Sequence, residues 1–205
     1  MNYMTIADAK NWPKREEQPL IISWPVPGCP GRICTLTRPE EWLQMVESVT
    51  LNPKVPDIIS RKYHRAQRLY AYGWLEFDFI KAGEFVAITA LESALRDRYL
   101  QPQSTGGQPP TLSRLLEKLV TKDGASDGSI PFAKKYGVSV IPSLLPRRRK
   151  NGAAVSVDLG GYRLAEIRNE MAHGDPFDGL PWSGLLELIR DLIEYAYRDY
   201  ICPSK

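Results

Sequence analysis

A long stretch without proline, from Asp57 to Gln101, limits the folds open to this chain more than any other feature. Nonpolar residues recur within it at spacings of three and four, which places them on one face of an α-helix. The repeating positions are Ile59, Tyr63, Ala66, Tyr70, Gly73, Trp74, Phe77 and Ile80, followed by Phe85, Ile88, Leu91, Leu95 and Tyr99. We interpret the aromatic positions as core packing. A helix with so broad a nonpolar face is buried against other helices, so the pattern predicts an all-α helical bundle.

A single helix over this stretch would be about 65 Å long at about 1.5 Å per residue, which is long for a globular domain. Glycine weakens a helix because its backbone loses more conformational freedom on folding than that of other residues. We therefore expect a kink or a break at Gly73 or at Gly83.

Further helices are predicted after this stretch, from the same spacing and from residues that favour helix ends. The first is capped by Thr111 and ends at Asp123-Gly124, the second covers Ile130 to Tyr136, the third opens near Asp158 or Gly160 and ends at His173-Gly174, and the last is capped by Ser183 and runs to Tyr200. Together with the long stretch they complete the expected bundle.

A short β-hairpin is expected near the N-terminus. Leu20 to Val26 is rich in β-branched and aromatic residues, and Pro25 restricts such a strand to the edge of a sheet. Arg32 to Thr37 follows a turn rich in proline and glycine and is the expected partner strand.

A short helix is predicted after the hairpin, because Thr37 and Glu40 form a capping-box pattern. Two prolines then separate it from the long helical stretch. We therefore divide the chain into an N-terminal arm and accessory unit, residues 1–55, and a helical bundle, residues 56–205.

The composition excludes several classes of protein. Hydrophobic residues at 43% and charged residues at 25% are ordinary for a globular chain and argue against disorder. The net charge of +3 neither requires nor excludes a polyanionic partner. The cysteines, Cys29, Cys34 and Cys202, are not spaced as a zinc site. A disulfide between Cys29 and Cys34 would need an oxidising compartment, and we expect reduced thiols.

No targeting segment or cofactor motif is recognised. The N-terminus lacks the regions of a signal peptide, and the apolar runs are far shorter than the ~20 residues of a membrane span. The glycine pairs at 106–107 and 160–161 lack the lysine and strand of a phosphate-binding loop, and Asp123 and Asp127 do not follow calcium-loop spacing. We expect a cytoplasmic protein with no membrane contact, no metal ion and no cofactor.

The segment with the clearest chemical potential is Arg168-Asn169-Glu170-Met171-Ala172-His173-Gly174. Gly174 is suited to the left-handed conformation that ends a helix, which would place His173 in the last turn. The negative end of the helix dipole favours the charged imidazole there, as suits a general acid or base. The alternative is purely structural, because histidine and glycine commonly end helices without any chemical role.

The spacing of Arg168 and His173 bears on how such a site would be built. Five positions correspond to about 140° around a straight helix, so the two side chains do not share a face. They could act together if the helix end is distorted, or if a second copy of the chain supplies the missing partner.

The pattern Arg-Asn-x-x-x-His, formed by Arg168, Asn169 and His173, resembles the signature of HEPN domains. The resemblance is specific over the motif, agrees with the helical pattern from Asp57 to Tyr200, and does not extend to residues 1–55. It implies an α-helical bundle that dimerises and brings two motifs into one cleft. Many members of this family are metal-independent ribonucleases of toxin–antitoxin, abortive-infection and CRISPR-linked systems.

The resemblance also implies roles for individual residues. Arg168 would bind the scissile phosphate and stabilise its developing charge, His173 would be the general acid or base, and Asn169 would orient the reacting groups. Glu170 lies between the motif positions and would either form an ion pair with an arginine such as Arg163 or be solvated.

Two basic groups are candidates for contact with RNA. The run Arg147-Arg148-Arg149-Lys150 lies in an expected loop and could hold a nucleic-acid backbone, or could simply be solvated. Arg61, Arg65 and Arg68 share one face of the first long helix, where a solvated face is the preferred interpretation. We assign His64 no catalytic role.

Three functions follow as hypotheses. The first is a metal-independent HEPN-type endoribonuclease, acting as a toxin or defence effector through a composite site in a homodimer, with an antitoxin or regulatory protein as a further partner. The second is a non-catalytic module of the same fold that binds RNA or regulates a partner. The third is an interaction scaffold in which the motif is only a helix end.

Overall fold

The computed structural model describes residues 11–100, 109–146, 162–174 and 180–202. This part of the chain is mostly helical and contains one small antiparallel sheet, as the sequence predicts. In chain order the elements are β1 (Leu20–Ser23), β2 (Ile33–Leu36), α1 (Pro39–Glu47), α2 (Asp57–Tyr72), α3 (Asp78–Tyr99), α4 (Leu112–Thr121), α5 (Pro131–Tyr136), α6 (Ile141–Leu144), α7 (Leu164–Ala172), α8 (Leu185–Ala196) and α9 (Arg198–Ile201).

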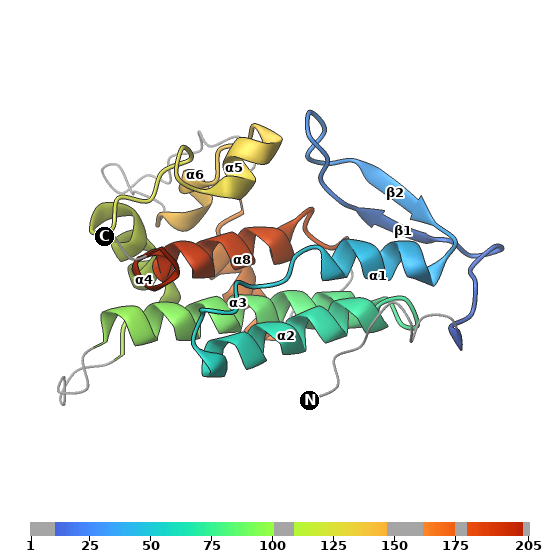
Figure 1. The fold of residues 1–205 in the computed structure, drawn as a ribbon, viewed down its shortest axis with the longest axis horizontal. Helices are drawn as coiled ribbons and strands as arrows, with labels where there is room; N and C mark the ends of the chain where they lie inside the picture. Colours follow the sequence, from blue (N-terminus) through green and yellow to red (C-terminus); the bar gives the residue numbers. More distant parts are fainter. Residues whose placement is uncertain (1–10, 101–108, 147–161, 175–179, 203–205) are drawn as a thin grey trace.

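The centre of the molecule is formed by α2, α3 and α8, which run alongside one another (Figure 1). The hairpin and the group of α4, α5 and α6 lie toward opposite ends of this layer (Figure 1). One hydrophobic core connects them all, from Leu20 on β1 to Tyr197 after α8. The broad nonpolar faces recognised in the sequence are therefore buried against each other.

The long helical stretch is broken at Gly73, one of the two positions predicted. Gly73 follows the last residue of α2, and α3 begins at Asp78 and continues through Gly83. Gly83 instead allows close helix packing, because a Cβ atom there would lie 2.6 Å from the Tyr70 Cδ2 atom on α2. Gly73 also permits a close approach, because a Cβ atom there would overlap the Ile80 side chain on α3.

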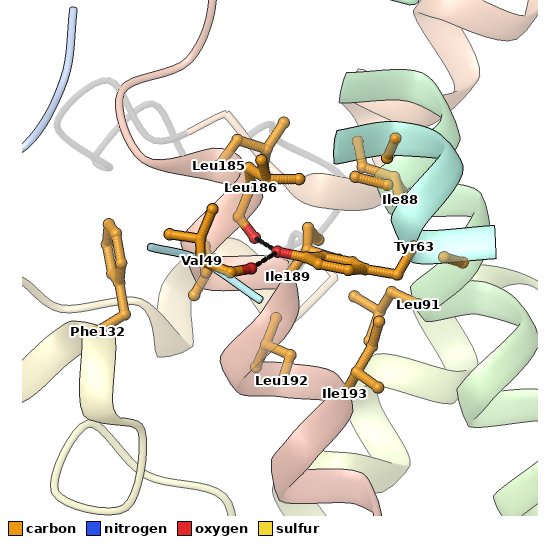
Figure 2. Close-up of a cluster of buried hydrophobic side chains, with 14 of the residues drawn as sticks. Val49, Tyr63, Ile88, Leu91, Phe132, Leu185, Leu186, Ile189, Leu192 and Ile193 are labelled. Carbon is orange, nitrogen blue, oxygen red and sulfur yellow. Dashed lines mark hydrogen bonds between the residues drawn. The ribbon is translucent and has the colours of Figure 1, made fainter. Parts of the chain in front are cut away.

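Tyr63 lies at the centre of the packed layer between α2, α3 and α8 (Figure 2). Its ring is fully buried beside Ile88 and Leu91 of α3. Its hydroxyl donates to the carbonyl oxygens of Val49, at 2.7 Å, and Leu186, at 3.0 Å. The single side chain therefore joins the end of α1, α2 and α8 by hydrogen bonds within the core.

A second buried donor attaches α1 to the C-terminal turn of α2. The Trp42 indole N–H lies 2.9 Å from the Tyr70 carbonyl oxygen and 3.2 Å from that of Ala71. The same two carbonyl oxygens also accept from the backbone N–H groups of Gly73 and Trp74, so the indole adds a third element to the turn that ends α2.

Two carboxylates of α8 hold the short helix α5. Asp191 accepts a hydrogen bond from the Phe132 backbone N–H at 2.6 Å. Glu187 accepts from the Tyr136 hydroxyl at 2.6 Å and pairs with Lys135 at 2.8 Å. Both carboxylates are almost fully buried, and these partners offset the loss of their hydration.

The predicted hairpin is confirmed. Leu20 pairs with Leu36 and Ser23 with Ile33 in an antiparallel register. Leu20 and Ile22 point into the core, whereas Ile21 lies on the outer face and is about half exposed. The alternation is that of a strand with one buried face.

Three helices begin at a different residue from the one that the sequence predicts. Arg38 rather than Thr37 precedes α1, because Pro39 at the first helical position restricts the residue before it to an extended conformation. The helix expected to open near Asp158 or Gly160 begins only at Leu164 as α7, and the described residues just before it, Tyr162 and Arg163, are not helical. Gly184 rather than Ser183 precedes α8, and the Ser183 hydroxyl donates to the Pro30 carbonyl oxygen.

Two further features concern membrane and metal contacts. None of the helices in the described ranges combines the length and the hydropathy that a membrane crossing needs. Among the same residues, no cluster of His, Cys, Asp and Glu could hold a metal ion. Cys29, Cys34 and Cys202 are free thiols.

Candidate functional site

The Arg168-to-Gly174 segment forms the end of α7, a helix that packs against α3, α4 and α6. Leu164 and Ile167 are buried, and Met171 packs partly against the core. These spacings of three and four orient one face of α7 inward. Arg168 therefore lies at the edge of the buried face, and Asn169 lies on the exposed side.

The start of α7 is held by Arg163. Its Nη1 atom donates to the carbonyl oxygens of Pro142, at 2.5 Å, and Leu145, at 2.6 Å, at the end of α6. The expected alternative of an ion pair between Arg163 and Glu170 is not formed. Glu170 is exposed, which agrees with the other alternative, a solvated side chain.

Arg168 is held in place by Glu92 from α3. The Arg168 Nε atom lies 3.2 Å from Glu92 Oε2, and the other carboxylate oxygen of Glu92 lies 2.7 Å from Arg96 Nη2. Glu92 is only 7% exposed, so a nearly buried carboxylate lies between two guanidinium groups. Such charge-assisted contacts contribute roughly 1.5–3 kcal/mol when they are well shielded from water.

Within the described residues, the contact with Glu92 leaves Nη2 of Arg168 without a partner and Nη1 with only a weak one. Glu92 accepts from Nε, and Nη1 lies 3.4 Å from the Asn169 side-chain oxygen, a long contact. The Arg168 side chain is 34% exposed. A guanidinium fixed through Nε can still bind two oxygens of a phosphate through its outer edge.

His173 ends the helix, as predicted. Its backbone N–H donates to the carbonyl oxygens of Asn169 and Glu170, and its backbone has left the helical conformation, with ψ at 7°. Gly174 follows with a φ of 80°, the left-handed conformation that glycine adopts most readily. The His173 side chain is exposed.

The structure brings only part of the motif together within one chain. Arg168 contacts Asn169 and Glu92, whereas no hydrogen bond or ion pair within the described ranges joins Arg168 to His173. Arg168 and His173 are thus separate features of one helix end, each accessible to solvent.

Glu92 was missed by the sequence analysis, although the sequence contains a signal for it. It lies four residues after Ile88 and three before Leu95, on the nonpolar face of α3. An acidic residue at a core-facing position needs a charged or hydrogen-bonding partner. Arg96, four residues on, is one such partner and is identified by local spacing, whereas Arg168 is 76 positions away and is not.

The two basic groups proposed to contact RNA differ in what the structure shows of them. The run Arg147-Arg148-Arg149-Lys150 lies outside the described residues, so its position relative to α7 is not defined. On α2, Arg61 pairs with Asp57 at 2.5 Å and Arg65 is exposed, which agrees with a solvated face. Arg68 is half-buried and lies beside His64.

Comparison with models of protein families, with characterised proteins and with solved structures finds no match to this chain.

Proposed function

We propose that the chain is a metal-independent endoribonuclease of the HEPN type, acting in the cytoplasm as a homodimer whose active site is composed of residues from both copies. The observation that carries the proposal is the Glu92–Arg168 contact. It fixes a guanidinium at an exposed edge, where among the described residues Nη2 has no partner, on the same helix end as an exposed histidine.

The chemistry requires a base, an acid and a group that stabilises phosphate charge. In RNA cleavage the 2′-oxygen attacks the adjacent phosphorus, a new P–O bond forms, and the bond to the 5′-oxygen breaks. His173 takes the proton of the 2′-hydroxyl or supplies one to the leaving oxygen. Arg168 binds the phosphate oxygens, on which negative charge increases in the transition state.

Fixation by Glu92 suits this role for Arg168. A flexible arginine would lose side-chain entropy on binding phosphate, whereas one already held through Nε loses less. Asn169, within 3.4 Å of Nη1, limits the rotation of the same group and is the orienting residue. The fixed guanidinium therefore supports phosphate binding, although such a contact by itself also suits a structural arginine.

The separation of Arg168 and His173 supports a composite site. Neither side chain contacts the other within the described part of one chain, and both face solvent near the end of α7. A two-fold axis beside this helix end would place Arg168 of each copy near His173 of the other. The proposed toxin or defence role, with an antitoxin or regulatory protein as partner, follows from the family resemblance.

The direct test is incubation of purified protein with total RNA and a metal chelator, comparing wild type with His173→Ala. We expect cleavage by wild type and a loss of about 100-fold or more in the variant. Glu170→Gln is the matched control, because it alters an exposed residue of the same turn and should retain cleavage. Circular dichroism should show the same helicity for all three proteins.

The outcomes separate the functional alternatives. RNA that is bound by wild type but remains intact would favour the non-catalytic RNA-binding module. Cleavage that persists in His173→Ala would refute the proposed chemistry. A large loss of stability in Arg168→Gln, with no RNA binding by wild type, would favour the scaffold.

A further inference from the structure

The α1–α2 pocket is a second feature with the properties of a binding site, and it is separate from α7. It is lined by α1, α2 and the segment that connects them, and it has a volume of about 740 Å³. Pockets that bind small molecules commonly measure about 300–1,000 Å³. The volume is therefore sufficient for a ligand with a substantial nonpolar body.

The floor of the α1–α2 pocket is nonpolar. Leu43 and Val46 come from α1, Leu51 and Val55 from the connecting segment, and Ala71 from the last turn of α2. These residues also belong to the main hydrophobic core. The floor is thus a fixed surface rather than a set of mobile side chains.

Most polar groups of the wall are already engaged. The Gln67 side-chain amide donates to the Val46 carbonyl oxygen, and the Ser60 hydroxyl donates to that of Val55. Asp57 pairs with Arg61, which largely offsets its negative charge toward the pocket. These contacts hold the wall in shape and leave few groups to bind a ligand.

Arg68 is the one positively charged exception among the described lining residues. Its side chain is half-buried and lines the pocket, yet within the described residues it forms no hydrogen bond and no ion pair. The neighbouring His64 has its pKa lowered, first by burial and then by Arg68, which favours its neutral form. The exposed Glu47 also lines the pocket, and among the described residues its carboxylate has no ion-pair partner.

We propose that the α1–α2 pocket binds a small amphipathic carboxylate, with the carboxylate on Arg68 and an aliphatic body on the floor formed by α1 and the connecting segment. A guanidinium binds a carboxylate through two parallel hydrogen bonds, which suits a single unpaired arginine. Extended nucleic acid is a poor match, because binding its backbone needs a row of cations. The pocket is independent of Arg168 and His173.

The test is calorimetric titration of the full chain with hexanoate, octanoate and decanoate, each below its micelle concentration. We expect affinity to rise about fourfold for each methylene that becomes buried. Arg68→Gln should weaken decanoate binding by about tenfold or more. Arg65→Gln removes the same charge one turn away, outside the pocket, and should bind as wild type does.

A blocking variant and a neutral ligand complete the design. Thr50→Phe places a ring at an exposed position of the pocket lining and should abolish binding, while circular dichroism should show the helicity of wild type. Decanol should bind at least tenfold more weakly than decanoate. The proposal is overturned if decanoate does not saturate the protein, if Arg68→Gln binds equally well, if decanol binds as tightly, or if chain length has no effect.

Discussion

Arg168 is held by a carboxylate from a different helix, and this contact links the candidate site to the stability of the fold. Glu92 lies between Arg168 and Arg96 and is nearly buried. A group in such a position affects both the folded state and any chemistry that depends on Arg168. The two effects are separable by substitution.

Replacing Glu92 by Gln keeps its shape and removes its charge. We expect the free energy of unfolding to fall by about 1–2 kcal/mol, since both arginines are more than a third exposed and water screens the pairs. RNA cleavage should fall because Arg168 is no longer fixed. Denaturation with urea and the RNA assay measure the two effects.

A double-mutant cycle tests whether the Glu92–Arg168 pair accounts for the lost stability. Glu92→Gln and Arg168→Gln should be non-additive by about 0.5 kcal/mol or more, because each substitution removes the same contact. Additive effects, or unchanged stability in Glu92→Gln, would show that the contact does not hold Arg168.

Tyr63 is a separate test of the core. Tyr63→Phe removes a hydroxyl that donates to two buried carbonyl oxygens, those of Val49 and Leu186 (Figure 2). We expect a loss of about 1–3 kcal/mol in the free energy of unfolding, because both acceptors remain buried. Tyr72→Phe is the control. Tyr72 is 42% exposed, and removing its hydroxyl should change the free energy of unfolding by less than about 0.5 kcal/mol.

At the scale of elements, the packing of α2 on α3 depends on Gly83. A Cβ atom there would lie 2.6 Å from Tyr70 Cδ2 and 3.2 Å from the Ala66 carbonyl oxygen. We expect Gly83→Ala to destabilise the protein by about 1–3 kcal/mol, despite the higher helix propensity of alanine. Thermal unfolding measures the change, and an increase in melting temperature would contradict the close packing.

Gly128→Ala is the matched substitution. A Cβ atom at Gly128 would have only the Ser126 hydroxyl nearby, at 3.8 Å. The variant should therefore unfold within about 0.5 kcal/mol of wild type. The contrast between the two glycines isolates the effect of the α2–α3 contact.

Glu84 connects α3 to the segment before α8 and predicts a pH dependence. Its carboxylate is fully buried, accepts from the Trp182 backbone N–H and pairs with Lys81 at 3.2 Å. Burial raises the pKa of Glu84 to about 7, against the lowering effect of Lys81. The folded state therefore binds a proton more tightly than the unfolded state, whose pKa is near 4.5.

The sign of the effect follows from proton linkage. Between pH 4.5 and 7 the folded state holds more protons than the unfolded state, so the contribution of Glu84 to stability decreases as pH rises through this window. Glu84→Gln should remove this decrease, which we expect to be on the order of 2 kcal/mol. Urea unfolding from pH 5 to pH 8 compares the two proteins, and parallel pH profiles would contradict the assignment.

Helix spacing in the sequence predicted which residues are helical and buried, but it predicted helix starts and long-range contacts less well. The helix start at Thr111, the short helix ending at Tyr136 and the helix end at His173-Gly174 were all predicted and are confirmed. Ser183 was wrongly assigned as a cap, because its hydroxyl contacts Pro30 across the chain. Similarly, Glu92 meets Arg168 only after the bundle has formed, and so the site was predicted without its buried acid.

At the scale of the whole molecule, Arg168 and His173 of a single chain do not contact each other. Dimerisation is the proposed means of completing the site. Arg168 and His173 are on one helix end, yet no described contact joins them. If the active site combines Arg168 of one copy with His173 of the other, two inactive variants should restore activity when they are mixed.

Arg168→Ala and His173→Ala provide this test. A mixed dimer has one site that lacks both residues and one that has both. Random exchange of equal amounts makes about half of all dimers mixed, so activity should recover to about a quarter of the wild-type value. Each variant alone should be inactive. The mixture is unfolded and refolded together, its dimeric mass is checked by light scattering, and cleavage of RNA is measured in chelator. A mixture that forms dimers but stays inactive would show that the site does not combine these two residues across the interface.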